Sequence, residues 1–337
     1  MSSRILFTVL LVLPGTLHAE DVKSFLPQRW TYSAPLISPE NRDVARSHAQ
    51  KDPSLVFHNG NWHVFMTVKL QGKSVMEHCS FTDWEQANDS KRTLLKVSDR
   101  DYFCAPQVFY FEPQQLWYLI YQVGVPGQKK MQVAYSTTKT IADPNSWTKA
   151  KVILDGGDDD PRGKGGLDYW VICDAKTAYL FITTNNGKMW RLQTPIEEFP
   201  HGFGKYTLAL QGDIFEASHT YTIQGTSQYL TLIEVNGRRY FKAYIADRLD
   251  GEWRPLAATA EQPFASWKNV SPADGVQPWT DNVSHGELIR ASNDQTLTID
   301  PKDLRFVFQG MWEKDKNGLN YGAWNWRIGL LSPSEEP

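Results

Sequence analysis

Long apolar runs are almost absent from this chain of 337 residues. The main one, Ile5 to Leu13, follows Arg4, ends at Pro14-Gly15, and is followed by Leu17-His18-Ala19, which resembles a small-residue cleavage site. Such a run is too short to span a bilayer, and no later segment approaches that length. We therefore predict a signal peptide over residues 1–19, a secreted mature protein and no membrane partner.

An excess of positive charge is also missing. Lysine and arginine number 35 against 38 aspartates and glutamates, which gives a net charge of −3. Nucleic acids and anionic membranes both attract clustered positive charge. We therefore expect no nucleic-acid partner.

Cysteine is scarce. Cys79, Cys104 and Cys173 are widely spaced, and each stands in an apolar, strand-like run. An odd number without a Cys-x-x-Cys pair indicates neither a disulfide framework nor a zinc site. Buried free thiols are favoured, although the pattern leaves one bridge open.

The sequence also lacks any sustained stripe of apolar residues with helical spacing. Its apolar pattern indicates β-hairpins instead. Asn59-Gly60 between two apolar runs is a strong hairpin signal. Similar hairpins recur, and the aromatic residues that open their second strands are Trp62, Trp117, Tyr179, Tyr229 and Phe306. A repeat of roughly fifty to sixty residues has the size of a propeller blade.

This repeat predicts an all-β, five-bladed β-propeller. A two-sheet sandwich is the alternative, but it would not explain the repeat. We expect residues 20–337 to form one domain, in which residues 20–50 are an N-terminal segment belonging to the propeller and residues 51–337 form the catalytic part.

Three carboxylates stand near the start of innermost strands. These strands are predicted to begin near Asp52, Ala105-Pro106, Asp168, Glu216 and His285. Asp52, Asp168 and Glu216 precede their hairpin aromatics by 10, 11 and 13 residues, which predicts similar heights at one mouth of the central channel. One such aspartate alone would be interpreted as a cap on backbone N–H groups, but three in register favour a functional site.

Two carboxyl groups that flank a glycosidic bond can hydrolyse it, one as acid and the other as base or nucleophile. A third carboxylate beside the acid raises the pKa of that acid by repulsion between like charges. The predicted cluster is therefore suited to glycoside hydrolysis.

The chain also resembles the α-L-arabinofuranosidases of glycoside hydrolase family 62. The motifs that carry the resemblance follow one another along nearly all of the mature chain: 51–53, 59–64, 81–84, 105–111, 117–122, 168–174, 215–218, 236–241, 284–287, 296–301 and 308–311. The resemblance implies an inverting enzyme that releases arabinose from arabinoxylan, with activity on arabinan left open.

Roles for individual residues come from the same resemblance. It makes Asp52 the general base, Glu216 the general acid and Asp168 the group that orients the acid and tunes its pKa. Further positions implied to contact substrate are Lys51, Arg239, Tyr321 and Trp170.

His285 by itself is more typical of a hydrogen-bonded core histidine. The resemblance instead implies a structural Ca²⁺ ion beside it in the channel, held largely by water.

Two alternative functions are also compatible with the sequence. A related five-bladed arabinanase or β-xylosidase would share the three carboxylates. A non-catalytic carbohydrate-binding propeller is the alternative outside enzymes. We expect a monomer.

Overall fold

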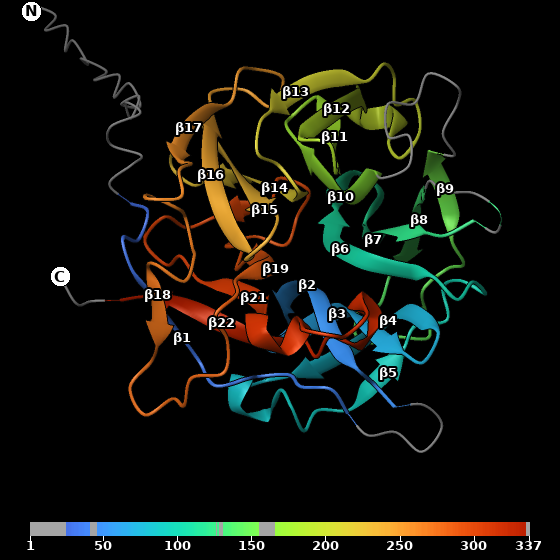
Figure 1. The fold of residues 1–337 in the computed structure, drawn as a ribbon. Coiled ribbons are helices and arrows are strands. Elements are labelled where there is room, and N and C mark those ends of the chain that lie inside the picture. Colours follow the sequence, from blue (N-terminus) through green and yellow to red (C-terminus); the bar gives the residue numbers. More distant parts are fainter. Residues whose placement is uncertain (1–24, 41–45, 126, 128–130, 155–165, 335–337) are drawn as a thin grey trace, which may run out of the picture.

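The computed structural model describes residues 25–40, 46–125, 127, 131–154 and 166–334. The predicted signal peptide lies outside them. Five β-sheets surround a central axis, and one strand of each lies closest to that axis (Figure 1). The predicted five-bladed propeller is therefore confirmed, and the two-sheet sandwich is wrong.

The first three blades each consist of four consecutive antiparallel strands. Blade one contains β2 (Ala49–His58), β3 (Asn61–Leu70), β4 (Lys73–Phe81) and β5 (Arg92–Leu94). Blade two contains β6 (Phe103–Phe111), β7 (Leu116–Val123), β8 (Gln132–Thr138) and β9 (Lys151–Leu154). Blade three contains β10 (Gly166–Cys173), β11 (Thr177–Thr184), β12 (Lys188–Pro195) and β13 (Thr207–Gln211).

Blades four and five each include strands from distant parts of the chain. Blade four contains β14 (Glu216–Ile223), β15 (Tyr229–Val235), β16 (Tyr240–Ala246), β17 (Arg254–Ala257) and the late strand β20 (Thr298–Ile299). Blade five contains β19 (Ser284–Leu288), β21 (Phe306–Gly310), β22 (Arg327–Pro333), β1 (Trp30–Tyr32) and β18 (Val270–Pro272). Because β1 pairs with β22, the two ends of the described chain close the ring within one sheet.

The fifth predicted hairpin needs a correction. The turn before Phe306 exists, with the Asp303 N–H donating to the carbonyl of Asp300. The strand that precedes it, β20, pairs in parallel with β14 of blade four. The chain therefore leaves blade five after β19 and returns at β21, which explains why the interval from His285 to Phe306 is longer than in the other blades.

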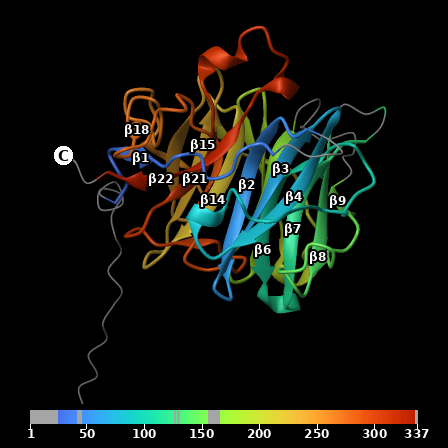
Figure 2. The ribbon, with the colours of Figure 1, turned by 90° about the horizontal axis from the view of Figure 1, so that it is seen from below.

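Short 3₁₀ helices occupy the connections: η1 (Trp84–Gln86), η2 (Glu112–Gln114), η3 (Ile196–Glu198), η4 (Glu313–Lys316) and η5 (Tyr321–Ala323). The red segment that carries η4 and η5 rises beyond the edges of the sheets in the side view (Figure 2). No helix among the described residues is long and apolar enough to cross a membrane.

Aromatic side chains form much of the core. The largest fully buried side chains are Trp30, Trp170, Trp326, Tyr118, Tyr121, Tyr221, Phe65, Phe109, Phe111, Phe181, Phe199 and Phe241. Burial of each such side chain removes roughly 150–250 Å² of surface from water. At about 25 cal/mol per Å², this burial stabilises the fold by at most about 4–6 kcal/mol per side chain. The three cysteines are buried and free, as the sequence favoured.

A buried ion pair joins three blades near the axis. Arg290 Nε lies 2.7 Å from Glu287 Oε1, and both side chains are almost fully buried. Arg290 Nη2 also donates to the carbonyls of Leu55 in blade one and Val108 in blade two. The inner strands are thus fixed to one another by charge as well as by packing.

Candidate active site

A β-bulge interrupts every innermost strand near the same mouth of the channel. The register with the second strand shifts by one residue in β2, β6, β10, β14 and β19. In the first four strands a residue within the bulge has positive φ, at Asp52 (49°), Ala105 (54°), Asp168 (52°) and Ala217 (56°). Positive φ is uncommon outside glycine, and bulges beside active sites redirect side chains.

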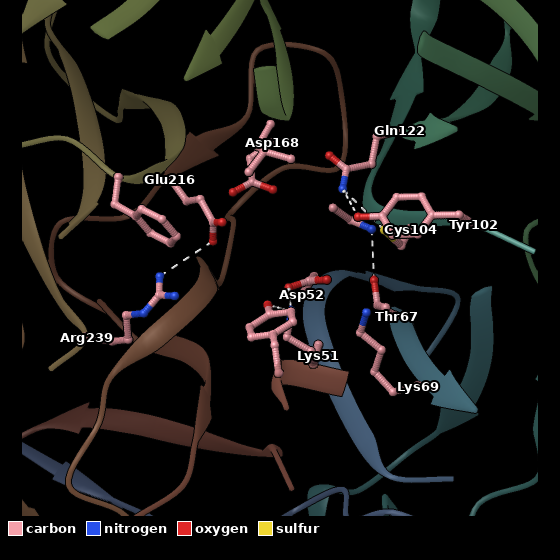
Figure 3. A pocket seen from close by; sticks show the side chains of 14 residues that line it. Lys51, Asp52, Thr67, Lys69, Tyr102, Cys104, Gln122, Asp168, Glu216 and Arg239 are labelled. Carbon is pink, nitrogen blue, oxygen red and sulfur yellow. Dashed lines mark hydrogen bonds and ion pairs between the residues drawn. The ribbon is translucent and has the colours of Figure 1, made fainter. Parts of the chain in front are cut away.

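The bulges correct two expectations about the carboxylates. Asp52 and Asp168 lie inside their strands, because β2 begins at Ala49 and β10 at Gly166. Glu216 precedes the bulge residue Ala217, so its equivalent in blade one is Lys51 rather than Asp52. The three carboxylates nevertheless reach one pocket, as Figure 3 shows.

Side chains of the neighbouring blade fix these bulges through hydrogen bonds. Each accepts a hydrogen bond from the backbone N–H of the residue at the next bulge: Thr67 from Ala105 (2.8 Å), Asp168 from Ala217 (3.0 Å), Glu234 from His285 (3.0 Å) and Gln309 from Asp52 (2.8 Å). Four of the five blade junctions are therefore bonded at the height of the site. Such contacts fix the strained backbone that positions the carboxylates.

The pocket is small, and most of the residues that line it are polar or charged. It has a volume of about 230 Å³. Its lining includes all three predicted carboxylates and three of the four predicted substrate contacts, Lys51, Arg239 and Tyr321. The volume lies below the roughly 300–1,000 Å³ of pockets for drug-sized ligands, which suits a single sugar ring.

Trp170 does not belong to this site. It is 2 % exposed, its Nε1 donates to the carbonyl of Thr220, and its ring stacks on His219 at 4.2 Å. The family resemblance implies a substrate contact at this position. The bulge instead directs Trp170 into the core, so the prediction that it contacts substrate is wrong.

His285 lies between two of the carboxylates. Its Nδ1 is 3.6 Å from Asp52 Oδ1 and 3.4 Å from Asp168 Oδ2. Burial opposes a charged imidazole, but the two aspartates outweigh it and raise the pKa of His285 to about 9. Near neutral pH an imidazolium therefore bridges Asp52 and Asp168.

The cationic side chains of His285 and Lys51 keep Asp52 and Asp168 ionised. Burial alone would raise the pKa of Asp52, but Lys51 and His285 lower it below its usual value. Burial likewise opposes ionisation of Asp168, but His285 and the N–H of Ala217 help to lower its pKa to about 2. Lys51 Nζ lies 3.2 Å from Asp52 Oδ1 and donates to the hydroxyl of Tyr321 at 2.7 Å.

Glu216 has the opposite character. Burial, with Asp168 and Glu234 as further causes, raises the pKa of its carboxyl group to about 8, although Arg239 and Lys51 act in the other direction. One carboxyl group of the pocket is thus protonated at neutral pH while two are ionised. This is the division of roles that acid–base catalysis requires.

A protein-held calcium ion does not fit the described residues. Calcium takes six to eight oxygen ligands, whereas the described part of the chain contains no group of three or more histidine, cysteine, aspartate or glutamate residues that could hold a metal. The Nδ1 of His285 is already engaged by two carboxylates. A largely water-held ion stays a prediction from the resemblance, and acid–base catalysis by the three carboxylates does not require it.

Several pocket residues were not found from the sequence. They are Thr67, Lys69, Tyr102, Gln122 and Phe215, with Glu234 buried directly behind Glu216. Most come from the second strand of a blade or from the connections. Finding them would require the register of each hairpin, which the bulges conceal. Among these residues, only Glu234 stands out in the sequence, because it is a carboxylate within an otherwise apolar predicted strand.

Comparisons with known proteins agree with this geometry. The sequence profile of Glycosyl hydrolase family 62 matches residues 29–332. Alpha-L-arabinofuranosidase C of Cellvibrio japonicus (strain Ueda107) is 36% identical over 314 residues, which are 90% of this chain and 47% of that protein. The chain thus spans about half the length of this relative.

Two solved structures cover the chain more evenly. The catalytic domain of a Coprinopsis cinerea GH62 alpha-L-arabinofuranosidase has a TM-score of 0.84 and 38% identity, covering 91% of this chain and 98% of its own. A GH62 hydrolase in complex with xylotriose has a TM-score of 0.82 and 35% identity, covering 90% of this chain and 97% of its own.

Proposed function

The chain belongs to glycosyl hydrolase family 62, and from that premise we propose that it is an α-L-arabinofuranosidase that releases single arabinose side chains from arabinoxylan by an inverting mechanism. The observation that carries the proposal is the convergence of Asp52, Asp168 and Glu216 on one pocket, where burial raises the pKa of Glu216 to about 8 while the pKa values of Asp52 and Asp168 are lowered. A relative that binds xylotriose supports a xylan backbone as the group that carries the arabinose.

In the proposed reaction Glu216 is the general acid. It gives its proton to the glycosidic oxygen as the bond to the anomeric carbon breaks. Asp52 is the general base, which takes a proton from water as that water attacks the anomeric carbon from the opposite face. Proton and charge balance in this single step, because Glu216 becomes a carboxylate and Asp52 a carboxylic acid.

Asp168 assists the acid in two ways. Its negative charge makes ionisation of Glu216 less favourable, so that the proton stays in place near neutral pH. Its Oδ2 accepts the N–H of Ala217, which fixes the backbone next to Glu216. Asp168 thereby acts on Glu216 through charge and through position.

Lys51, Arg239 and Tyr321 are proposed to bind the sugar hydroxyls. Lys51 and Arg239 are buried cations at the wall of the pocket, whereas Tyr321 is 42% exposed at its rim. Charged donors make stronger hydrogen bonds than neutral ones. The protein is also proposed to be secreted, on the strength of residues 1–19.

The proposal is tested by incubating the purified protein with wheat arabinoxylan. We expect free arabinose as the main product and an undegraded xylan backbone, because a pocket volume of about 230 Å³ suits a single sugar ring. Chromatography of the products would detect both. Release of xylose from xylo-oligosaccharides, or of arabino-oligosaccharides from linear arabinan, would contradict the proposal in favour of a β-xylosidase or an arabinanase.

A further inference from the structure

A second buried glutamate stands directly behind the proposed acid. Glu234 lies in β15, is fully buried and pairs across the strands with Glu216 of β14. Two carboxylates at directly opposed positions repel each other, and a buried charge is costly without partners. The position of Glu234 therefore calls for a physical reason.

The partners of Glu234 are all donors. Its Oε1 accepts from Arg239 Nη1 at 3.1 Å and from the hydroxyl of Ser284 at 2.7 Å, and its Oε2 accepts from the N–H of His285 at 3.0 Å. A carboxyl group that accepts three hydrogen bonds and donates none has the arrangement of a carboxylate.

Arg239 is shared unequally between the two glutamates. Its Nη1 is hydrogen-bonded to Glu234 at 3.1 Å and lies 3.7 Å from Glu216 Oε2. Its guanidinium group also stacks over Phe215, 3.9 Å from the ring centre. Glu234 thus engages the cation that would otherwise pair with the acid.

The charged and titratable groups that face Glu216 are Asp168 of β10, Glu234 of β15, Lys51 of β2, Arg239 and Tyr321. The two cations favour the ionised form of Glu216, and the two carboxylates favour its protonated form. Glu234 acts twice in this balance, because its own charge repels a second carboxylate and because it holds the guanidinium group.

A chain of hydrogen bonds leads from Glu234 to the proposed base. Ser284 Oγ, which donates to Glu234, accepts from Gln309 Nε2 at 3.0 Å. Gln309 Oε1 in turn accepts the backbone N–H of Asp52 at 2.8 Å. Ser284 and Gln309 are each 2% exposed, so these contacts are shielded from bulk solvent.

We propose that Glu234 is a positioning residue of the reaction, which keeps Glu216 protonated by engaging Arg239 and fixes the backbone of Asp52 through Ser284 and Gln309. This inference rests on the proposed function. It adds a fourth carboxylate to the machinery, one that acts through other residues and does not line the pocket.

The test is the pH dependence of kcat/KM in Glu234→Gln. Wild-type activity should fall as the pH rises through about 8, where Glu216 loses its proton. In the variant one negative neighbour is lost and Arg239 is free to pair with Glu216, so ionisation of the acid becomes easier. The basic limb should move to lower pH by about one unit or more, the effect of a cation within a few ångströms.

Ser284→Ala is the matched control. It removes a hydrogen bond from the same network without changing any charge. We expect lower kcat with the basic limb in its wild-type position. Circular dichroism and thermal unfolding would confirm that both variants are folded.

A slower Glu234→Gln variant with an unmoved basic limb would overturn the inference, because a merely structural role predicts that result. If this variant does not fold, Glu234→Asp replaces it. The shorter side chain of aspartate withdraws the carboxylate from Arg239, so the basic limb should move in the same direction by a smaller amount. An unmoved basic limb would again overturn the inference. A wild-type protein without activity on any arabinofuranoside would refute the proposed function, and the inference would fall with it.

Discussion

Replacing Asp52 by asparagine should lower kcat/KM on arabinoxylan by roughly 10²- to 10⁴-fold, the usual contribution of a general base. The reason is that asparagine cannot take a proton from the attacking water. The bulge should survive, because Gln309 bonds the backbone N–H of residue 52 and asparagine tolerates positive φ. Initial rates of arabinose release would measure the loss.

Asp99→Asn serves as the control for this change. Asp99 is an exposed carboxylate paired with Lys149 and does not line the pocket. This variant should keep wild-type activity. An Asp52→Asn variant that is folded and retains more than about a tenth of the wild-type rate would remove Asp52 from the mechanism.

Replacing Glu216 by glutamine should have an effect that depends on the leaving group. On arabinoxylan the loss should again be roughly 10²- to 10⁴-fold, because the departing sugar oxygen needs a proton. On 4-nitrophenyl α-L-arabinofuranoside the loss should be much smaller, because nitrophenolate leaves without one. The basic limb of the pH profile should also disappear, since its titrating group is gone.

The comparison between the two variants gives this prediction its control. Asp52→Asn should lose activity on both substrates, because water must be activated whichever group leaves. Equal losses on both substrates in Glu216→Gln would show that Glu216 does not protonate the leaving group.

The fold was predictable from the sequence because blades repeat. Turn residues such as Asn59-Gly60 and the aromatics that follow them mark local events, and local signals survive in one sequence. The closure of the ring was harder to predict. The pairing of β1 with β22 and of β20 with β14 joins segments far apart in the chain, and short strands of two or three residues carry little pattern.

The site was predictable in composition and less so in geometry. Asp52, Asp168 and Glu216 do meet in one pocket, but the single extra residue in each inner strand cannot be seen from alternation alone. That residue decides which side chain faces the channel. It turns Trp170 into the core and sets Glu216 one position before its bulge.

Glu234 shows what sequence patterns miss most readily. Its neighbours in β15 are apolar, and its role depends on Arg239, Ser284 and Gln309, which come from other strands and turns. Such a network is a property of three-dimensional contacts. The sequence shows only that a carboxylate stands where an apolar residue would be expected.

The stereochemistry of the first product tests the central claim most directly. Asp52 and Glu216 come from blades one and four, so we predict a separation of about 6.5–9.5 Å, which leaves room for water between base and sugar. Proton NMR in the first minutes of hydrolysis, before mutarotation, would identify the anomer. The single-displacement mechanism predicts β-L-arabinofuranose from an α-linked substrate. If α-L-arabinofuranose appears first, water does not attack in one step and Asp52 is not the base.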